Sequence, residues 1–313
     1  MMPDPGRGYP LALLSAVILS TTAVFIRHLT EAYHLPALVL AFWRAGFAAA
    51  TLLAVLGLLK PALLRVTRRE LGFLALYGLM LGGFNATWTL AVALTNASLA
   101  TVLVNGSAAF TAVLGWWLLE ERLGWSKAAA VVLSLVGCAI VSGMADPGAW
   151  RANALGIFTG IASALFYAAY SLMGRTASQR GLNPWTAVFY TFAFSCACLF
   201  LLNLTRLLPG TGNLLHLGRV PAGWGWLLLL AAGPTVVGFG LYNASMKHLP
   251  SSVANLIMTS EPVFTALLAY QLFRERLDGP QLAGSAMVLG GVVLLRLSQR
   301  WRTVSAGAAP MGE

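Results

Sequence analysis

The stretch 118–138, LLEERLGWSKAAAVVLSLVGC, recurs 154 residues further along the chain at 272–292, as LFRERLDGPQLAGSAMVLGGV. Both copies carry the string ERL, which apolar composition alone hardly produces. Without any gap, scattered identities continue upstream as far as Ser98, which falls opposite Ser252. Self-similarity at a long, fixed period indicates a duplicated structural unit.

Nearer the amino terminus the two copies align less well and need small gaps. Trp88 still falls opposite Tyr242, and Ser15 falls opposite Ser163, an offset of 148 residues. The copies meet near 145–153. The repeat therefore extends over nearly the whole chain.

The chain is strongly apolar and poor in charge. Of its 313 residues, 58% are hydrophobic and 10% are charged, and the formal net charge is +10. Soluble domains average about 25% charged residues, so a single water-soluble domain is excluded. Lys and Arg cluster densely only between Lys60 and Arg69, which does not indicate a nucleic-acid-binding protein. The lipid bilayer is the natural solvent of this chain.

Ten apolar stretches follow one another with short polar breaks. At about 1.5 Å rise per residue, a helix of about 20 residues crosses a hydrocarbon core of about 30 Å. Strands of a membrane barrel would be shorter and alternate in polarity, which these do not. The first stretch can also be read as a cleaved signal peptide, but its counterpart in the second copy favours a span. The sequence predicts an all-α integral membrane protein with ten transmembrane helices: Tyr9–Ile26, Pro36–Leu59, Leu71–Leu94, Ser98–Leu119, Trp125–Gly143, Ala154–Gly174, Pro184–Leu204, Gly223–Met246, Ser252–Phe273 and Gln281–Leu297.

The distribution of basic residues predicts the orientation in the membrane. With the amino terminus in the cytoplasm, 13 of the 20 Lys and Arg residues lie on the cytoplasmic side and Arg44 lies within a span. Cytoplasmic loops carry the basic excess in most membrane proteins, so both termini are predicted to be cytoplasmic. The six basic residues left on the outer side are Arg27, Arg151, Arg206, Arg219, Arg274 and Arg276.

Each copy holds five spans, an odd number, so the second copy must enter the membrane upside down relative to the first. Inverted repeats are a device of secondary transporters, in which two copies exchange inward-open and outward-open shapes around a central site. We therefore expect two inverted five-helix repeats, residues 1–144 and 154–298, with a connecting loop at 145–153 and a cytoplasmic tail at 299–313.

Three motifs resemble a known family. GWWLLEERL (115–123) closes the fourth span, SEPVFTALLAYQLFRERL (260–277) forms the ninth, and FWRAGFAAA (42–50) lies in the second. Together with the two five-helix repeats they resemble the EamA family of the drug/metabolite transporter superfamily. The resemblance implies a secondary-active exporter of small metabolites, such as amino acids or amphipathic drug-like compounds. Relatives often carry proline in the fourth span where this chain has Ala108, so the hinge that Pro262 supports in the ninth span lacks its counterpart there.

Two charged residues lie deep within predicted spans. Glu261 is about ten residues into the ninth span and Arg44 about eight into the second, and neither has a charged counterpart in the other copy. A charge at mid-membrane survives if it is paired, faces water or is used. For Glu261 the functional reading is a proton-coupling carboxylate or a partner for a substrate ammonium. The alternative is a structural role, paired with Arg44 or bonded to backbone amides beside Pro262.

For Arg44 the same two readings apply, and the structural one is favoured slightly. Its functional alternative is to bind a substrate carboxylate through two parallel hydrogen bonds. Polar and aromatic residues within spans could line a cavity with these charges, although Asn, Ser and Tyr also join helices to one another. The substrate-binding candidates are Arg44, Asn85, Trp88, Asn105, Ser107, Tyr167, Tyr170, Tyr190, Tyr242, Asn243 and Glu261; Pro262 is the hinge candidate.

Motifs for other chemistry are absent from the sequence. It has no G-x-x-x-x-G-K-[ST], HExxH or GxSxG, so neither ATP hydrolysis nor these hydrolytic activities are expected. The four histidines show no ligand spacing, so no metal and no cofactor is expected. Two alternatives to a carrier stay open: an integral-membrane enzyme acting on lipid-linked substrates, and a facilitative channel on the same fold.

The expected partners are a small-molecule substrate, the lipid bilayer and, as coupling ions, protons. The expected location is the inner (plasma) membrane of a bacterium, which the chain crosses several times. A homodimer stays open alongside a monomer.

Overall fold

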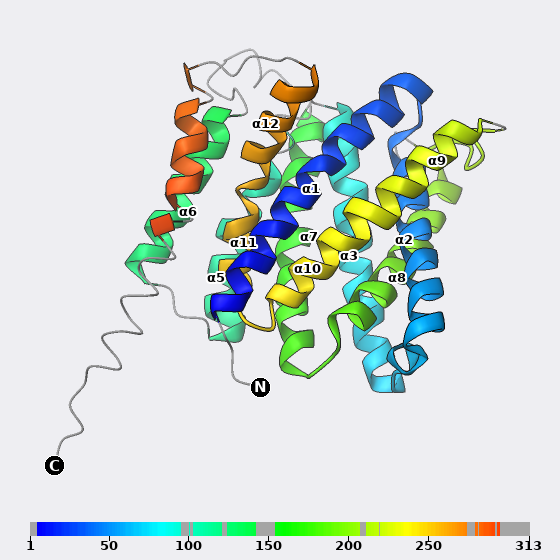
Figure 1. The fold of residues 1–313 in the computed structure, drawn as a ribbon, viewed down its shortest axis with the longest axis horizontal. Coiled ribbons are helices and arrows are strands. Elements are labelled where there is room, and N and C mark those ends of the chain that lie inside the picture. Colours follow the sequence, from blue (N-terminus) through cyan, green and yellow to red (C-terminus); the bar gives the residue numbers. More distant parts are fainter. Residues whose placement is uncertain are drawn as a thin grey trace.

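The computed structural model describes residues 5–94, 100, 103–120, 124–141, 154–206, 211–218, 220–273, 279–280, 282–291 and 293–294. Within these ranges the regular structure is entirely helical (Figure 1). The predicted connecting loop at 145–153 and the predicted tail at 299–313 lie outside the described residues. So do Arg151, Arg219, Arg274 and Arg276 of the predicted outer side.

The helices follow the predicted apolar spans in order. Among the described residues, five helical segments are long and apolar enough to cross a membrane: Ala37–Leu59, Arg68–Val92, Leu155–Gln179, Pro184–Thr205 and Pro221–Ser245. The chain is thus an all-helical, multi-pass membrane protein. In chain order the elements are α1 (Pro5–Tyr33), α2 (Ala37–Leu59), the 3₁₀-helix η1 (Pro61–Leu64), α3 (Arg68–Leu94), α5 (Ser107–Leu119), α6 (Trp125–Val141), α7 (Ala154–Gln179), α8 (Pro184–Thr205), α9 (Pro221–Leu230), the π-helix η3 (Ala231–Thr235), α10 (Val236–Ser245), α11 (Ser251–Met258) and α12 (Glu261–Phe273).

Two helices run past the predicted spans. α1 continues from Ile26 to Tyr33, and α7 continues from Gly174 to Gln179. The added turns carry polar side chains. These residues interrupt the apolar pattern of the sequence, but the helix continues through them. One of them, Arg175, donates from Nη1 to the carbonyl oxygen of Met246 at 2.6 Å. Hydropathy therefore marks the apolar stretch and not the helix end.

The ninth predicted span is interrupted. α11 ends at Met258 and α12 begins at Glu261, with a turn between them. Pro262 has no backbone N–H, so it cannot donate the helical hydrogen bond to the carbonyl of Met258. The break therefore lies where the proline removes a bond from the helix.

The fourth predicted span is interrupted at the equivalent point although it has Ala108 and no proline. Residues 103–105 are helical, Gly106 forms a turn with its N–H on the carbonyl of Leu103 at 3.2 Å, and α5 begins at Ser107. Ser107 lies 154 residues before Glu261, the first residue of α12. Glycine lowers helix stability here, as proline does in the ninth span. The irregularity is a single turn residue whose φ and ψ, −54° and −20°, stay in the α-helical region, so the fourth span is perturbed at this register without a proline.

The fifth and tenth spans approach each other closely. A Cβ atom on Gly137 of α6 would lie 2.7 Å from the carbonyl oxygen of Gly284 and 2.9 Å from the backbone nitrogen of Val288. Both atoms belong to the helical segment 282–291. Only a residue without a side chain allows the two backbones to come this near.

The same contact recurs with the two spans exchanged. A Cβ on Gly291 would lie 3.0 Å from the carbonyl oxygen of Ala130 and 3.5 Å from the backbone nitrogen of Ser134. Each of these residues is 154 positions from its counterpart in the Gly137 contact. The packing between the two copies is therefore reciprocal at this point.

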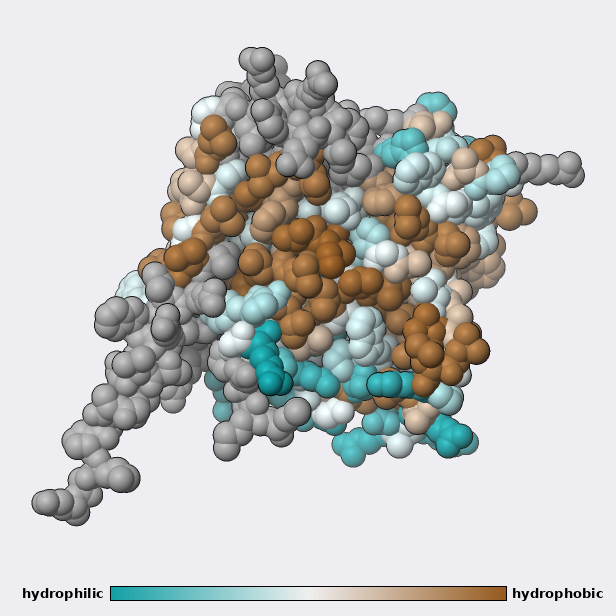
Figure 2. Space-filling view, in the orientation of Figure 1, coloured by the Kyte–Doolittle hydropathy of each residue, from teal (hydrophilic) through white to brown (hydrophobic). Residues whose placement is uncertain are grey.

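The remaining helices also pack across the two copies. α1 lies against α10, α11 and α12, α7 lies against α3 and α5, and α2 lies against α8. Figure 1 shows α1 rising from the lower edge of the view while α7 descends toward it. Figure 2 shows apolar residues across the middle of this face and hydrophilic residues along its lower edge. On α1, Leu13 and Leu14 are exposed, as expected for side chains that face lipid.

Candidate functional site

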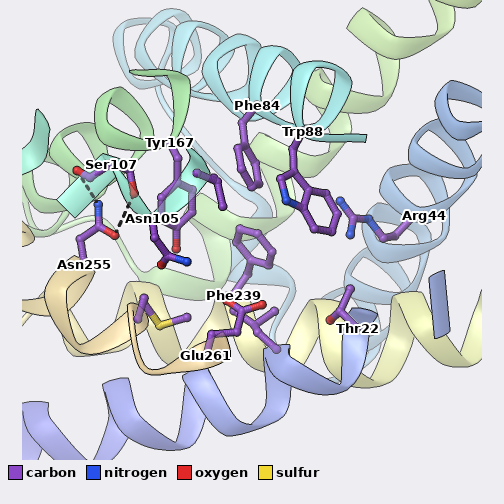
Figure 3. Close-up of a pocket in the computed structure, with 13 residues that line it drawn as sticks. Thr22, Arg44, Phe84, Trp88, Asn105, Ser107, Tyr167, Phe239, Asn255 and Glu261 are labelled. Carbon is purple, nitrogen blue, oxygen red and sulfur yellow. Dashed lines mark hydrogen bonds between the residues drawn. The ribbon is translucent and has the colours of Figure 1, made fainter. Parts of the chain in front are cut away.

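A cavity opens beside the interrupted fourth and ninth spans (Figure 3). Its volume is about 70 Å³, room for a few water molecules. Six of the residues singled out from the sequence meet around it: Arg44, Trp88, Asn105, Ser107, Tyr167 and Glu261. They come from α2, α3, α5, α7, α12 and the helical turn before α5. Both halves of the chain therefore build one site.

Arg44 of α2 is the positive charge of the cavity. The residue is 3% exposed, and its Nη2 donates a hydrogen bond to Oδ1 of Asn85 on α3. The centre of the guanidinium lies 5.8 Å from the centroid of the Trp88 ring, within cation–π range. Nε has no hydrogen-bond partner among the described residues. One donor of a buried cation is thus left unused next to an open volume.

Asn85 is a support for Arg44 and does not line the cavity itself. Its Nδ2 donates to Oγ of Ser195 on α8 at 3.4 Å, and its side chain is fully buried. With its amide held from behind, its oxygen is fixed toward the guanidinium. The structure therefore places this predicted cavity residue behind Arg44, in contact with the guanidinium and not with the cavity.

Glu261 begins α12 and faces the same cavity. Figure 3 shows its side chain across the open volume from Arg44. Among the described residues, no hydrogen bond or ion pair to the Glu261 carboxylate is recorded, so neither structural alternative, a direct pair with Arg44 or bonds to backbone amides, is seen. A carboxylate at a helix N-terminus is favoured by the helix dipole. The two charges attract each other at a distance while the space between them stays open.

Asn255 of α11 joins the two interrupted spans. Its Nδ2 donates to Oγ1 of Thr111 at 2.7 Å and to the carbonyl oxygen of Ser107 at 3.3 Å, and its Oδ1 accepts from Oγ of Ser107 at 3.4 Å. This contact fixes the start of α5 against α11. It gives the cavity a wall of paired amide and hydroxyl groups (Figure 3).

Three predicted cavity residues lie instead in a buried polar cluster. Asn243 accepts a hydrogen bond from Oη of Tyr77 at 2.7 Å and donates to Oη of Tyr170 at 2.8 Å. Tyr242 is hydrogen-bonded through Oη to Oγ of Ser171 at 2.6 Å. Asn243 therefore bonds to Tyr170 and Tyr77, Tyr242 bonds to Ser171, and none of the three predicted residues lines the cavity.

Tyr190 is another predicted residue that does not line the cavity. Its Oη donates to the carbonyl oxygen of Leu64, in η1, at 2.7 Å. The hydroxyl fastens the α2–α3 connection to α8, so the structure does not bring this side chain to the cavity.

Aromatic and apolar side chains complete the walls. Phe84 packs on Tyr167 with ring centroids 4.9 Å apart, and Phe239 lies opposite them in Figure 3. The sequence analysis did not predict these aromatic and apolar lining residues, nor the polar residues Thr22 and Asn255. The lining residues that it did not name are Leu19, Thr22, Phe84, Val104, Phe239, Asn255 and Met258.

A helical-face argument could have found several of them. Met258 precedes Glu261 by three residues, and Asn255 precedes Met258 by three, so each of these pairs is adjacent in a ninth span predicted as one continuous helix. Phe84 precedes Trp88 by four residues and shares its face in the same way. Such a lining, apolar with a few polar groups and one charge of each sign, has the chemical character of a site for small amphipathic molecules.

Comparison with known proteins agrees with this architecture. A family model described as the EamA-like transporter family matches residues 6–143 and 154–297. An "Uncharacterized transporter" of Archaeoglobus fulgidus is 30% identical over 287 residues, 92% of this chain and 95% of that protein. A "Probable amino-acid metabolite efflux pump" of Salmonella typhimurium is 25% identical over 295 residues, 91% of this chain and 93% of that protein.

A solved structure, titled "Crystal structure of protein", has the same fold. Its TM-score is 0.78 at 17% identity, and the match covers 95% of this chain and 99% of the other. The family model matches the chain twice, once in each half. The chain therefore belongs to the EamA-like transporter family, within the drug/metabolite transporter superfamily, and is a membrane transporter and not an enzyme.

Proposed function

We propose that this chain is a secondary-active transporter that exports small metabolites, such as amino acids or amphipathic drug-like compounds, by alternating access. The observation that carries the proposal is that Arg44 of the first half and Glu261 of the second half face one cavity. Charges inside a membrane are costly, and unpaired ones that face a cavity typically mark a substrate or ion pathway. The Salmonella relative, named as a probable amino-acid metabolite efflux pump, supports the substrate class.

The architecture of the proposed carrier is two inverted five-helix repeats, residues 1–144 and 154–298. The interruptions before Ser107 and Glu261, at one shared register, support this arrangement. The reciprocal contacts of Gly137 and Gly291 support it as well, because a two-fold axis between the proposed repeats would relate each contact to the other. In the proposed mechanism Pro262 is the hinge of the ninth span.

One side of the cavity is closed by the tyrosine cluster. Tyr242 of α10 stacks on Tyr167 and Tyr170 of α7, with ring centroids 5.9 and 6.4 Å apart, and bonds to Ser171. Tyr167, Tyr170 and Ser171 lie at and just beyond the middle of α7, and Tyr242 lies near the end of α10. In this conformation these contacts hold α7 and α10 together.

Among the described residues, no ring stacking or hydrogen bond is seen between the counterparts of this tyrosine cluster, and Oγ1 of Thr22 has no hydrogen-bond partner. Trp88 is the counterpart of Tyr242, and Leu19 and Thr22 of α1 are the counterparts of Tyr167 and Tyr170 at the offset of 148 residues. All three line the cavity. An exchange of roles between the halves would pack Trp88 onto α1 and release Tyr242 from α7. The repeat thus supplies both end states of an alternating-access cycle.

The charged residues suit separate tasks in such a cycle. The Arg44 guanidinium can donate to a substrate carboxylate, because Asn85 and Trp88 already fix its plane. The Glu261 carboxylate can bind a substrate ammonium, or take a proton when the cavity is open to the side of higher proton concentration. Asn105, Ser107 and Tyr167 would supply further contacts to the substrate.

The proposed location is the inner membrane of a bacterium with both termini in the cytoplasm. Exposed basic residues support this orientation, since they gather where α1 begins and where α2, α7 and α10 end. The described examples on that side are Arg7, Lys60, Arg65, Arg68, Arg69, Arg180 and Lys247.

Counterflow in proteoliposomes tests the proposal. Vesicles loaded with an unlabelled amino acid should accumulate the labelled one from outside, and uptake should saturate. A thermal-shift screen of the purified protein against metabolites selects the compounds to load. Flux that rises linearly with concentration and shows no counterflow would instead identify a channel.

A further inference from the structure

Four cations crowd the connection between α2 and α3. Lys60, Arg65, Arg68 and Arg69 are all exposed and lie within ten residues of sequence. No ion pair of theirs is recorded among the described residues. The connection lies at the lower edge of Figure 1, where the helices end. Four positive charges are therefore presented together at the boundary of the membrane.

Other arginines on the described part of the chain have interactions of their own. Arg175 donates to the carbonyl oxygen of Met246, and the guanidinium of Arg180 lies 4.4 Å from the centroid of the Phe73 ring. Those side chains serve the packing of the protein. The four at the α2–α3 connection serve no such contact.

The acid next in sequence is already engaged. The Glu70 carboxylate accepts from the backbone N–H and from Oγ1 of Thr67, both at 2.7 Å. Oγ1 of Thr67 in turn accepts from the N–H of Glu70 at 3.3 Å, so the pair caps the start of α3. Glu70 therefore orders the backbone between the arginines and is recorded in no ion pair with them.

The connection is held in place from the side of α8. Oγ1 of Thr186 donates to the carbonyl oxygen of Leu63 at 2.8 Å, and Oη of Tyr190 donates to that of Leu64 at 2.7 Å. These bonds fix η1, which has no buried residues of its own. The cations thus extend from a positioned scaffold, which reduces the entropy lost when a ligand binds.

Apolar side chains accompany the charges. Leu58 and Leu59, the last residues of α2, are 84% and 75% exposed. Exposed leucines directly before a run of cations match a molecule with an acyl chain and an anionic head. A soluble anion would use the cations and leave the leucines bare.

We propose that the α2–α3 connection binds the headgroup of an anionic phospholipid. The phosphate accepts hydrogen bonds from Arg65, Arg68 and Arg69 with Lys60 nearby, and the acyl chains lie along Leu58 and Leu59. Basic residues at a membrane boundary attract anionic lipid strongly, and arginine binds phosphate through two parallel bonds. The proposal concerns a surface outside the cavity and does not depend on the transported substrate.

Lipid retention by the purified protein tests this site. The protein is equilibrated in micelles that contain equal amounts of phosphatidylglycerol and phosphatidylcholine, and bound lipid is counted by native mass spectrometry. Wild type should retain phosphatidylglycerol in at least about tenfold preference. The variant with Lys60, Arg65, Arg68 and Arg69 replaced by glutamine should lose that preference.

A matched control removes the same charge elsewhere. Arg7, Arg180, Arg206 and Lys247 are exposed and lie outside this connection, and their replacement by glutamine should leave the preference intact. Equal loss in both variants, or no preference in wild type, would overturn the proposal. Displacement of the lipid by glycerol phosphate would identify a site for soluble phosphate instead.

A second measurement covers a variant that fails to fold. In wild type, raising the salt concentration to about 1 M shortens the screening length to about 3 Å and should abolish the preference. A preference that persists in high salt would show that these charges do not select the lipid.

Discussion

Gly137 and Gly291 stand at equivalent positions in the two halves of the chain, and each lies against the helix that carries the other. The contact holds the fifth and tenth spans together through their backbones. Because different residues make the contact at Gly137 and the contact at Gly291, a substitution can disrupt either contact separately.

Replacing either glycine with alanine should therefore destabilise the protein. Gly137→Ala places a Cβ 2.7 Å from a backbone oxygen, which no side-chain rotation relieves. We expect each variant to lower the free energy of unfolding by about 1–3 kcal/mol, as overpacking does. Thermal unfolding of the purified protein in detergent measures the loss.

Gly290→Ala is the matched control on the same helix as Gly291. A Cβ there meets a side-chain atom of Leu133 at 3.8 Å, an ordinary contact. Alanine is the better helix former, so this variant should be neutral or gain up to about 1 kcal/mol. Equal destabilisation of Gly290→Ala and Gly291→Ala would refute the close-approach account.

The carboxylate of Glu261 should decide whether a proton gradient drives transport. In Glu261→Gln the side chain keeps its size and cannot release a proton. We expect uptake driven by a pH gradient to fall to background while substrate exchange continues. Proteoliposomes with and without an imposed gradient separate the two activities.

Glu70→Gln is the control for this substitution, because Glu70 caps α3 at the surface. It should leave gradient-driven uptake unchanged. If Glu261→Gln also leaves that uptake unchanged, Glu261 has no part in proton coupling.

Arg44 should distinguish substrates by their carboxylate. Arg44→Lys keeps the charge but loses the planar donor pair and the contact with Trp88. Hydrogen bonds to charged groups are worth about 1.5–3 kcal/mol, so the KM for carboxylate-bearing substrates should rise about 10-fold to 150-fold. Amines without a carboxylate should be affected far less.

Arg180→Lys provides the comparison, since Arg180 also lies over an aromatic ring, that of Phe73, but outside the cavity. It should not alter KM for either class of substrate. A uniform loss for all substrates in Arg44→Lys would indicate a purely structural role for Arg44.

The tyrosine cluster should set how often the closed side opens. Tyr242→Phe removes the bond to Ser171 and keeps the ring stacking. Loss of one such bond, about 0.5–1.5 kcal/mol, should raise the open population about 2-fold to 13-fold. Spin labels on Arg180 and Lys247, in a background with the three cysteines replaced, report the separation of α7 and α10.

Tyr190→Phe serves as its control, because this hydroxyl bonds to η1 outside the cluster. The distribution of distances between the two spin labels should match that of the labelled protein in which Tyr190 and Tyr242 are both retained. No change in Tyr242→Phe would show that the hydroxyl does not hold the closed side.

The spans could be predicted from the sequence because a backbone in hydrocarbon must bond to itself. Each apolar run of about 20 residues has one stable solution, and α2, α3 and α8 follow the predicted ranges closely. The ends could not be predicted so well, since α1 and α7 continue through polar turns. The turn before Ser107 was missed because proline was taken as its sign and Gly106 was not.

The cavity was harder to predict than the helices. Arg44 and Glu261 could be found because a charge in an apolar span has few explanations. Tyr170 and Asn243 could not be separated from true lining residues, because a polar side chain in a span can face a ligand or another helix. Their bonds to one another depend on the meeting of α3, α7 and α10, which no single span specifies.

The tyrosine cluster and its counterpart around Trp88 differ in the kind of interaction that they can make. The tyrosine side is secured by hydrogen bonds among Tyr77, Asn243 and Tyr170, whereas its counterpart offers the indole of Trp88 against apolar and hydroxyl side chains of α1. Hydrogen bonds are enthalpic, and apolar contact near room temperature is largely entropic. In the proposed cycle, warming should therefore disfavour the conformation held by the tyrosine hydrogen bonds relative to the one held by Trp88 and α1. The fraction of molecules open to an inhibitor added from one side of the membrane should then depend on temperature.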